Sequence, residues 1–209
     1  MKKIFLAILL MPIIVFSQTQ GDYFVQYNYG QVFDRYNTDD INLYSPDVQT
    51  EFEGRDDVRM GKKYSFGYYI FNQVTLGIDY MDADISGANS IEYYNGKFNE
   101  ANIFLNYEIK ESNGIIFFGT VSYGYVEFDS KRYFVFDNAE ISLNTAEGTS
   151  QKFSYGAGIS YKLKPDVEIS LSIIDAIVDD GFDGWDYGSG SDQYLYQSIG
   201  VRIYLWAWE

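Results

Sequence analysis

The amino-acid sequence contains no histidine and no cysteine. Histidine titrates near neutral pH and is the usual general base of enzymes, so its absence excludes serine–histidine catalytic pairs. The absence of cysteine excludes cysteine–histidine nucleophiles, disulfides and a lipid anchor on cysteine. A mechanism built only from carboxylates, or from tyrosine and lysine, stays open. The composition therefore favours a protein that is not an enzyme.

Positive charge is also scarce. The 15 lysines and arginines stand against 30 aspartates and glutamates, which gives a net charge of −15. Such acidity argues against a nucleic-acid partner and against a basic patch for anionic lipid surfaces. Beyond residue 20 there is no run of about 18 apolar residues that would cross a bilayer as a helix. The sequence therefore predicts neither a nucleic-acid-binding protein nor a helical membrane protein.

The first residues have the features of a secretory signal. Two lysines precede an apolar run at residues 4–16, and Val15 and Ser17 stand at positions −3 and −1 of a cleavage site. The alternative is a retained helical anchor, but the run is too short to span a bilayer. We therefore expect a cleaved signal peptide at residues 1–17 and a single exported domain at residues 18–209.

The rest of the chain alternates between apolar and polar residues and is rich in aromatic side chains. Aromatic residues make up 19% of the sequence, and 21 residues are tyrosine. Within residues 58–70, for example, Tyr64 and Phe66 alternate with Lys63 and Ser65. A period of two is typical of β-strands with one apolar and one polar face. Tyrosine, with an apolar ring and a polar tip, is typical of the interfacial girdles of transmembrane barrels.

Eight such strands are predicted, and the joints between them alternate in length. The strands cover residues 22–32, 58–70, 74–81, 98–110, 115–126, 151–163, 167–174 and 194–206. Three joints are tight, among them Asn113-Gly114, which favours a two-residue hairpin, and Pro165-Asp166, where proline presets φ for a turn. The four other joints are long and polar, at residues 33–57, 82–97, 127–150 and 175–193.

Short turns at one end and long loops at the other are the arrangement of transmembrane barrels. The predicted fold is therefore all-β: an eight-stranded antiparallel up-and-down transmembrane β-barrel with its apolar face outside. The alternative is a soluble barrel or sandwich, because a period of two does not say which face meets water. A water-facing exterior would carry more lysine and glutamate than the glycine, serine, threonine and asparagine of this polar face.

The last predicted strand carries a resemblance to a known family. Residues 198–206 alternate as Ser-Ile-Gly-Val-Arg-Ile-Tyr-Leu-Trp and end in an aromatic residue, with three further residues after Trp206. In this stretch and in its topology the chain resembles the small outer-membrane barrels of the OmpA/OmpX type, often grouped as porin-family proteins. The resemblance implies a Gram-negative outer-membrane location, insertion by the barrel-assembly machinery, and contact with outer-membrane lipid and lipopolysaccharide. It does not extend to the peptidoglycan-binding domain of OmpA.

The polar face places charged residues inside the predicted barrel. They are Arg59, Lys63, Asp79, Glu108, Lys152, Lys162, Glu168 and Arg202. An eight-stranded barrel is only wide enough for side chains to fill it, and buried charges must pair or be hydrated. We expect a polar network that fills the lumen with ion pairs, with a narrow path for ions as the alternative. Lys62 falls on the apolar face, which a bulge or a lysine reaching toward the membrane interface would explain.

The last long loop, residues 175–193, is acidic and contains no basic residue. Four of its aspartates lie among glycines: Asp179, Asp180, Asp183 and Asp186. Ca²⁺ and Mg²⁺ prefer several carboxylate ligands on a backbone that can bend, so a weak metal site is one interpretation. A solvated loop of mutually repelling charges is the other. No cofactor is otherwise expected.

The expected function follows from these features. The chain is predicted to be a monomeric, integral outer-membrane barrel with a non-catalytic envelope or surface-binding role. The alternative is a narrow channel for ions or small solutes across the outer membrane. A lumen filled by side chains favours the envelope or surface-binding role, and a hydrated path through the lumen favours the channel.

Overall fold

The computed structural model describes residues 22–34, 59–88, 92–136, 139–179 and 192–205. The predicted signal peptide, the residues after Leu205, and Asp180, Asp183 and Asp186 lie outside these ranges. Within them, the structure has no helix of the length and apolarity that a membrane crossing requires.

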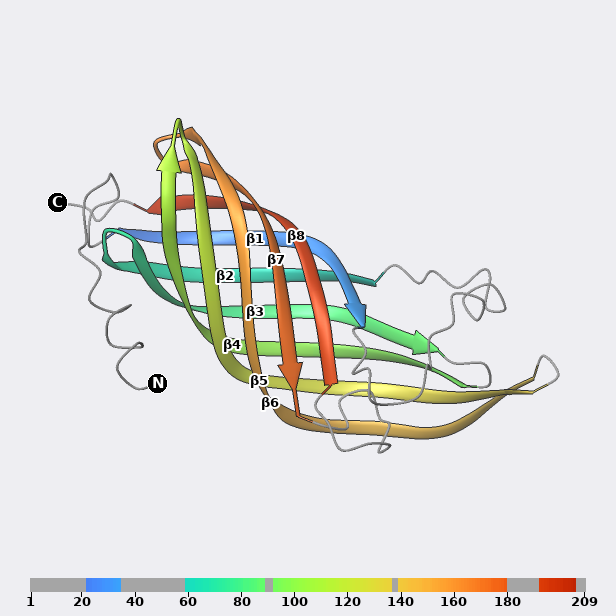
Figure 1. The fold of residues 1–209 in the computed structure, drawn as a ribbon. Helices are drawn as coiled ribbons and strands as arrows, with labels where there is room; N and C mark the ends of the chain where they lie inside the picture. Colours follow the sequence, from blue (N-terminus) through green and yellow to red (C-terminus); the bar gives the residue numbers. More distant parts are fainter. Residues whose placement is uncertain (1–21, 35–58, 89–91, 137–138, 180–191, 206–209) are drawn as a thin grey trace, which may run out of the picture.

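The described residues form a closed antiparallel barrel of eight strands (Figure 1). The strands are β1 (Tyr23–Asp34), β2 (Arg59–Phe71), β3 (Val74–Ala88), β4 (Glu92–Ser112), β5 (Ile115–Phe136), β6 (Ala139–Lys164), β7 (Val167–Val178) and β8 (Asp192–Leu205). Each strand pairs with its neighbours in sequence, and the barrel closes where β1 pairs with β8, with Tyr23 opposite Leu205. The predicted eight-stranded up-and-down barrel is confirmed.

The predicted apolar face points outward. On β2, Tyr64 and Phe66 are exposed whereas Lys63 is buried. On β8, Val201 is exposed whereas Arg202 is buried. A soluble barrel would bury its aliphatic and aromatic face, whereas a membrane barrel turns that face to lipid. The soluble alternative is therefore wrong.

The three tight turns lie at one end of the barrel, which we call the short-turn end. Asn113 and Gly114 both have positive φ angles, 54° and 79°, as a two-residue type I′ turn requires. Residues 72–73 and 165–166 form the two other turns. The strand register shifts by a residue beside each of these turns. Such bulges bend the strands where the hairpins close.

Two of the predicted long loops are wrong. The sequence predicts loops at residues 82–97 and 127–150, but the strands continue through most of both segments. β3 pairs with β4 as far as Ala88, and β5 pairs with β6 as far as Phe136. Figure 1 shows these strands extending to the lower right, past the ends of β7 and β8. At the start of these extensions the alternation reverses, since Phe128 is buried whereas Glu127 and Asp129 are exposed. The pattern of apolar outward residues that predicts the strands therefore ends there.

The inward face is less polar than predicted. Besides small polar residues it buries large side chains: Phe24, Tyr69, Phe98, Phe104, Ile116, Phe118, Val126, Phe128, Tyr194, Tyr196 and Tyr204. Three inward rings, those of Phe24, Phe104 and Phe118, each lie opposite a glycine on the neighbouring strand. A side chain at any of these glycines would overlap the ring. Glycine on the polar face therefore makes room for aromatic rings that fill the lumen.

Candidate functional site

The candidate site is the interior of the barrel, because buried charged side chains gather there. From the short-turn end to the opposite end, the interior holds three layers. They are a tyrosine–arginine network, a charge chain and an apolar plug, each defined below by its residues. Every layer is built from inward-facing positions of several strands, so each joins segments that lie far apart in the sequence.

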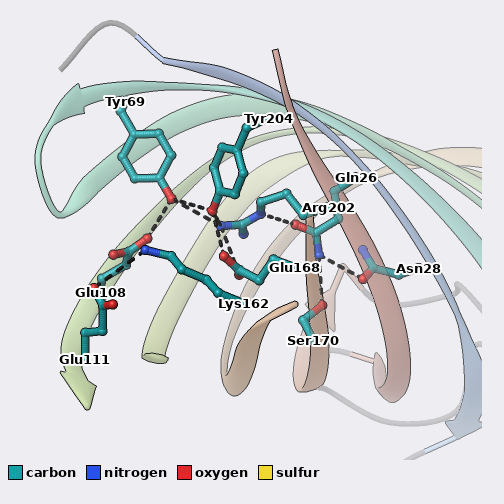
Figure 2. Close-up of polar contacts among 10 residues, drawn as sticks. All are labelled: Gln26, Asn28, Tyr69, Glu108, Glu111, Lys162, Glu168, Ser170, Arg202 and Tyr204. Atoms are coloured by element: carbon teal, nitrogen blue, oxygen red, sulfur yellow. Dashed lines mark hydrogen bonds and ion pairs between the residues drawn. The ribbon is translucent and has the colours of Figure 1, made fainter. Parts of the chain in front are cut away.

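The tyrosine–arginine network consists of Tyr69, Glu108, Glu168, Arg202 and Tyr204 (Figure 2). The Arg202 guanidinium lies 3.6 Å from the Glu168 carboxylate, and the Tyr204 hydroxyl donates to the same carboxylate at 2.6 Å. The Tyr69 hydroxyl donates to Glu108 at 2.6 Å and accepts from Arg202 at 3.2 Å. All five side chains are buried. The network therefore ties β2, β4, β7 and β8 together across the lumen.

Two further contacts fix the Arg202 guanidinium. Its Nε donates to Gln26 Oε1 at 2.9 Å, and its central carbon lies 4.2 Å from the centroid of the Phe24 ring. The amide nitrogen of Gln26 donates in turn to Asn28 at 2.9 Å and to Ser170 at 3.3 Å. Figure 2 shows these amide contacts beside the tyrosine pair. Carboxylate, amide and aromatic partners together satisfy a buried guanidinium without water.

The charge chain lies farther from the short turns. Lys63 Nζ is 2.8 Å from Asp79 Oδ2, and Asp79 Oδ1 accepts from the Asn102 amide at 2.6 Å. The same amide donates to Glu100 at 3.0 Å, and Glu100 pairs with Lys152. All five residues are buried. Two lysines thus balance two carboxylates around one asparagine, so the chain needs no counter-ion from solvent.

A small cavity separates these two layers. Its volume is about 30 Å³, and its lining includes Gln26 and Arg202 from one side and Lys63 and Asp79 from the other. This is enough room to hold a water molecule.

The apolar plug closes the described lumen toward the end opposite the short turns. It consists of Val32, Met81, Ala83, Phe98, Val126, Phe128, Ala176, Val178, Tyr194 and Tyr196. The rings of Phe98 and Tyr194 lie 5.1 Å apart between centroids. Lys152 Nζ lies 5.8 Å from the Tyr194 ring, so the plug begins where the charge chain ends. An apolar constriction blocks ions because it offers no replacement for their hydration shell.

The predicted lumen charges all occupy inward positions of the strands. Lys63, Asp79, Glu108, Lys152, Glu168 and Arg202 are buried, and Arg59 and Lys162 are half-buried. The structure brings four of these residues together in two pairs, Lys63 with Asp79 and Glu168 with Arg202, which the sequence did not specify. Lys162 instead pairs with Glu111 at 3.6 Å, close to the tyrosine–arginine network (Figure 2).

The sequence analysis missed the apolar plug and three ionisable members of the two other layers: Glu100, Tyr69 and Tyr204. Their parity was the available signal, since Glu100 is two residues from Asn102 and Tyr204 is two residues from Arg202, so each shares the inward face of that neighbour. Tyrosine is common on the outward face of this chain, so its presence at an inward position does not stand out in the sequence. Only the register shows that these two hydroxyls meet the buried carboxylates.

A row of exposed polar residues borders the outward apolar face, and we call it the polar border. In order of strand pairing it consists of Lys62, Asp82, Asn99, Glu127 and Thr149. From this row toward the short turns, the outward residues of β2 to β6 are mainly aliphatic, aromatic or small, and Gln151 on β6 is an exposed polar exception. The register is unbroken at Lys62, so the predicted bulge is wrong there. Lys62 is exposed at the edge of the apolar band, where a lysine reaches the interface.

The predicted metal site lies mostly outside the described residues. Asp179 follows β7 and is exposed, whereas Asp180, Asp183 and Asp186 are not described. Among the described residues, no cluster of three or more acidic, histidine or cysteine side chains could hold a metal ion. Calcium or magnesium binding by the last loop therefore stays a prediction.

Comparison with known proteins relates the chain to others by fold. No protein-family model and no curated protein sequence matches it. Neisserial surface protein A superposes with a TM-score of 0.52 at 14% identity, covering 87% of this chain and 96% of its own. Ail, the attachment invasion locus protein of Yersinia pestis, superposes with a TM-score of 0.52 at 14% identity, covering 90% of this chain and 100% of its own. The outer membrane protease OmpT from Escherichia coli superposes with a TM-score of 0.50 at 10% identity, covering 91% of this chain and 99% of its own. The chain thus has the fold of the small outer-membrane β-barrels.

Proposed function

We propose that this chain is an integral outer-membrane barrel with a closed lumen and a non-catalytic role in the envelope or at the cell surface. The observation that carries the proposal is the filled interior. The tyrosine–arginine network, the charge chain and the apolar plug follow one another along the lumen, and the cavity between the first two measures only about 30 Å³. A hydrated ion or solute would have to displace buried, paired side chains.

The outward face supports the proposed location. An apolar band ends at the polar border, as expected where a barrel wall leaves the hydrocarbon layer. On this proposal the barrel-assembly machinery inserts the chain as a monomer, outer-membrane lipid surrounds the apolar band, and lipopolysaccharide lies beside the polar border. The closed hydrogen bonding of all eight strands leaves no sheet edge within the band.

The strands beyond the polar border supply the surface for contact with partners. β3, β4, β5 and β6 continue past the ends of β7 and β8 as a sheet (Figure 1). Ail has been solved in complex with the heparin analogue sucrose octasulfate. A net charge of −15 disfavours such a polyanion here, so we expect a partner that is neutral or basic.

The non-catalytic part of the proposal depends on the sequence. OmpT shares the fold and is a protease, but a shared fold does not imply a shared function. The chain contains no histidine, and its buried carboxylates are engaged by arginine, lysine, tyrosine or asparagine side chains. These contacts favour a structural role for the interior charges.

Planar-bilayer conductance tests the closed lumen. The wild-type protein is expected to give no steady openings, whereas a Phe98→Ala, Tyr194→Ala variant, which empties part of the apolar plug, is expected to open intermittently. Val121→Ala, an outward substitution, serves as the control and should stay silent. Steady wild-type openings that change with Lys63→Ala would favour the narrow channel instead.

A further inference from the structure

The strand β6 leaves one of its edges open beyond the end of β7. Its pairing with β7 ends where Lys152 lies opposite Val178, and the backbone nitrogen of Asp179 donates one further hydrogen bond, of 3.2 Å, to the Gln151 carbonyl oxygen. From there to Ala139, β6 pairs with β5 on one side, whereas no described residue pairs with it on the other. Figure 1 shows this part of β6 running to the lower right, past the ends of β7 and β8. An open sheet edge of this kind can accept an additional strand.

The backbone groups that point out of this edge belong to every second residue of β6. The Gln151 carbonyl faces β7, so the N–H and C=O groups of Thr149, Glu147 and Thr145 face the same side. A register shift beyond Asn144 then interrupts the regular ladder. Three consecutive edge positions therefore each offer one backbone donor and one backbone acceptor to an incoming strand.

Acidic residues occupy the outward face beside the open edge. Asp129 on β5 lies directly opposite Glu147, and Glu127, two residues away on β5, shares the face of Asp129. Like charges that lie opposite each other on paired strands repel. Lys97 lies opposite Asp129 on the other side, toward β4, so it is farther from the open edge. A cation placed at the edge beside Glu147 would therefore reduce this repulsion.

We propose that the open edge of β6 binds an extended segment of a partner protein, as an added antiparallel strand with one lysine or arginine opposite Glu147. This assignment rests on the proposed function, because the edge then lies outside the membrane. Lys131 lies opposite Thr145, so uncharged residues suit the partner's flanking positions. Residues 139–150 contain no lysine or proline, which commonly protect an exposed edge. A second copy of this chain would bring its own acidic residues to the edge, and the like charges would repel.

Fluorescence polarisation with the detergent-purified protein and a labelled, capped peptide, Val-Thr-Val-Lys-Val-Thr-Val, tests the proposal. The wild-type protein should bind this lysine peptide, and a peptide with glutamate in place of lysine should bind at least about tenfold more weakly. Thr149→Pro should weaken binding of the lysine peptide by a similar factor, because it removes an edge N–H and its ring obstructs the added strand, while the pairing with β5 is kept. Thr149→Val retains that N–H and should bind like the wild type.

A charge exchange tests the partner's cation and decides the matter if Thr149→Pro does not fold. Glu147→Lys should reverse the preference, so that the glutamate peptide binds more tightly than the lysine peptide. An unbound lysine peptide, equal binding by Thr149→Pro and Thr149→Val, an unchanged preference in Glu147→Lys, or a wild-type dimer that Thr149→Pro abolishes would each overturn the assignment. In those cases a protein that requires detergent, shifts on boiling and conducts no ions leaves the proposed function intact. Solubility without detergent, or steady openings, would overturn the proposed function itself.

Discussion

At the scale of single residues, the space left by an inward glycine determines where the tyrosine–arginine network lies. Gly67 faces the ring of Phe24, which is fully buried. The Phe24 ring lies 6.0 Å from the Tyr69 ring and 6.2 Å from the Tyr204 ring, and Arg202 covers its face. A ring held on three sides has no room to move. The absence of a side chain at Gly67 therefore makes room for the Phe24 ring, against which Tyr69, Tyr204 and Arg202 pack.

Gly67→Ala is expected to lower the free energy of unfolding by about 1–3 kcal/mol, because the new methyl group overlaps the Phe24 ring. Gly119→Ala is the matched control, since the nearest atom to its added methyl group is the Gly156 carbonyl oxygen at 3.9 Å. Both substitutions remove similar backbone freedom from the unfolded chain. Denaturant unfolding in micelles, followed by circular dichroism, measures the difference. Equal stabilities would contradict the packing argument.

Arg202→Met is expected to cost about 3–5 kcal/mol of stability, because it leaves the buried Glu168 carboxylate without its cation. A double variant that combines Arg202→Met with Glu168→Leu should recover much of this loss, since no buried charge remains. The same unfolding measurement on both variants checks the prediction. If the double variant is as unstable as the single one, packing around the guanidinium matters more than charge pairing.

At the scale of the elements, each long strand has two parts divided by the polar border. On β4, the outward residues Leu105 and Ile103 lie in the apolar band, whereas Asn99 and Lys97 lie at or beyond the border. The outward face of the same strand is therefore suited to lipid along the apolar band and to water beyond the polar border. Its inward face is filled on both sides of the division, because Phe104 and Phe98 are both buried.

The position of the border predicts how a new charge on β4 affects stability. Leu105→Lys, at the middle of the apolar band, should destabilise the barrel by about 2–4 kcal/mol, whereas Asn99→Lys should cost only about 0–1 kcal/mol. Reversible unfolding in lipid vesicles measures both values. Similar costs at the two positions would show that the lipid boundary does not lie at the polar border.

At the scale of the whole molecule, closure of the barrel joins the two ends of the described chain. β1 pairs with β8 over the whole of its length, from Tyr23 opposite Leu205 to Asp34 opposite Tyr194, so the first and last strands close the sheet. The interior layers depend on this closure, since Arg202 on β8 reaches Tyr69 on β2 and Gln26 on β1. A partly closed barrel would expose these charges to the hydrocarbon layer.

The closed barrel predicts a heat-modifiable protein. Purified in detergent, it should migrate differently on a gel before and after boiling, because the hydrogen-bonded barrel resists unfolding until it is heated. Circular dichroism should show β-structure, and cell fractionation should place the protein with the outer membrane. Unchanged mobility together with solubility in the absence of detergent would contradict a membrane-inserted barrel.

Much of this arrangement could be predicted from the sequence. The period of two identified all eight strands and their outward faces, since alternation follows directly from strand geometry. Asn113-Gly114 marked its turn because both positions need positive φ. The extensions at residues 82–97 and 127–150 were not predicted, because the alternation reverses beyond the apolar band: Phe128 is buried there, whereas Glu127 and Asp129 are exposed.

The candidate site was only partly predictable for a related reason. Parity placed charges such as Lys63 and Asp79 on the inward face, and the sequence alone determined that they would need partners. Which partner each one has depends on the register between strands and on the bulges beside the turns. Tyr69 meets Glu108 and Arg202 only because closure brings β2, β4 and β8 around one lumen. The period of two is a local property of the chain. The partner of each buried charge, and the side chains that fill the lumen, are properties of the closed barrel, so tertiary structure alone decided them.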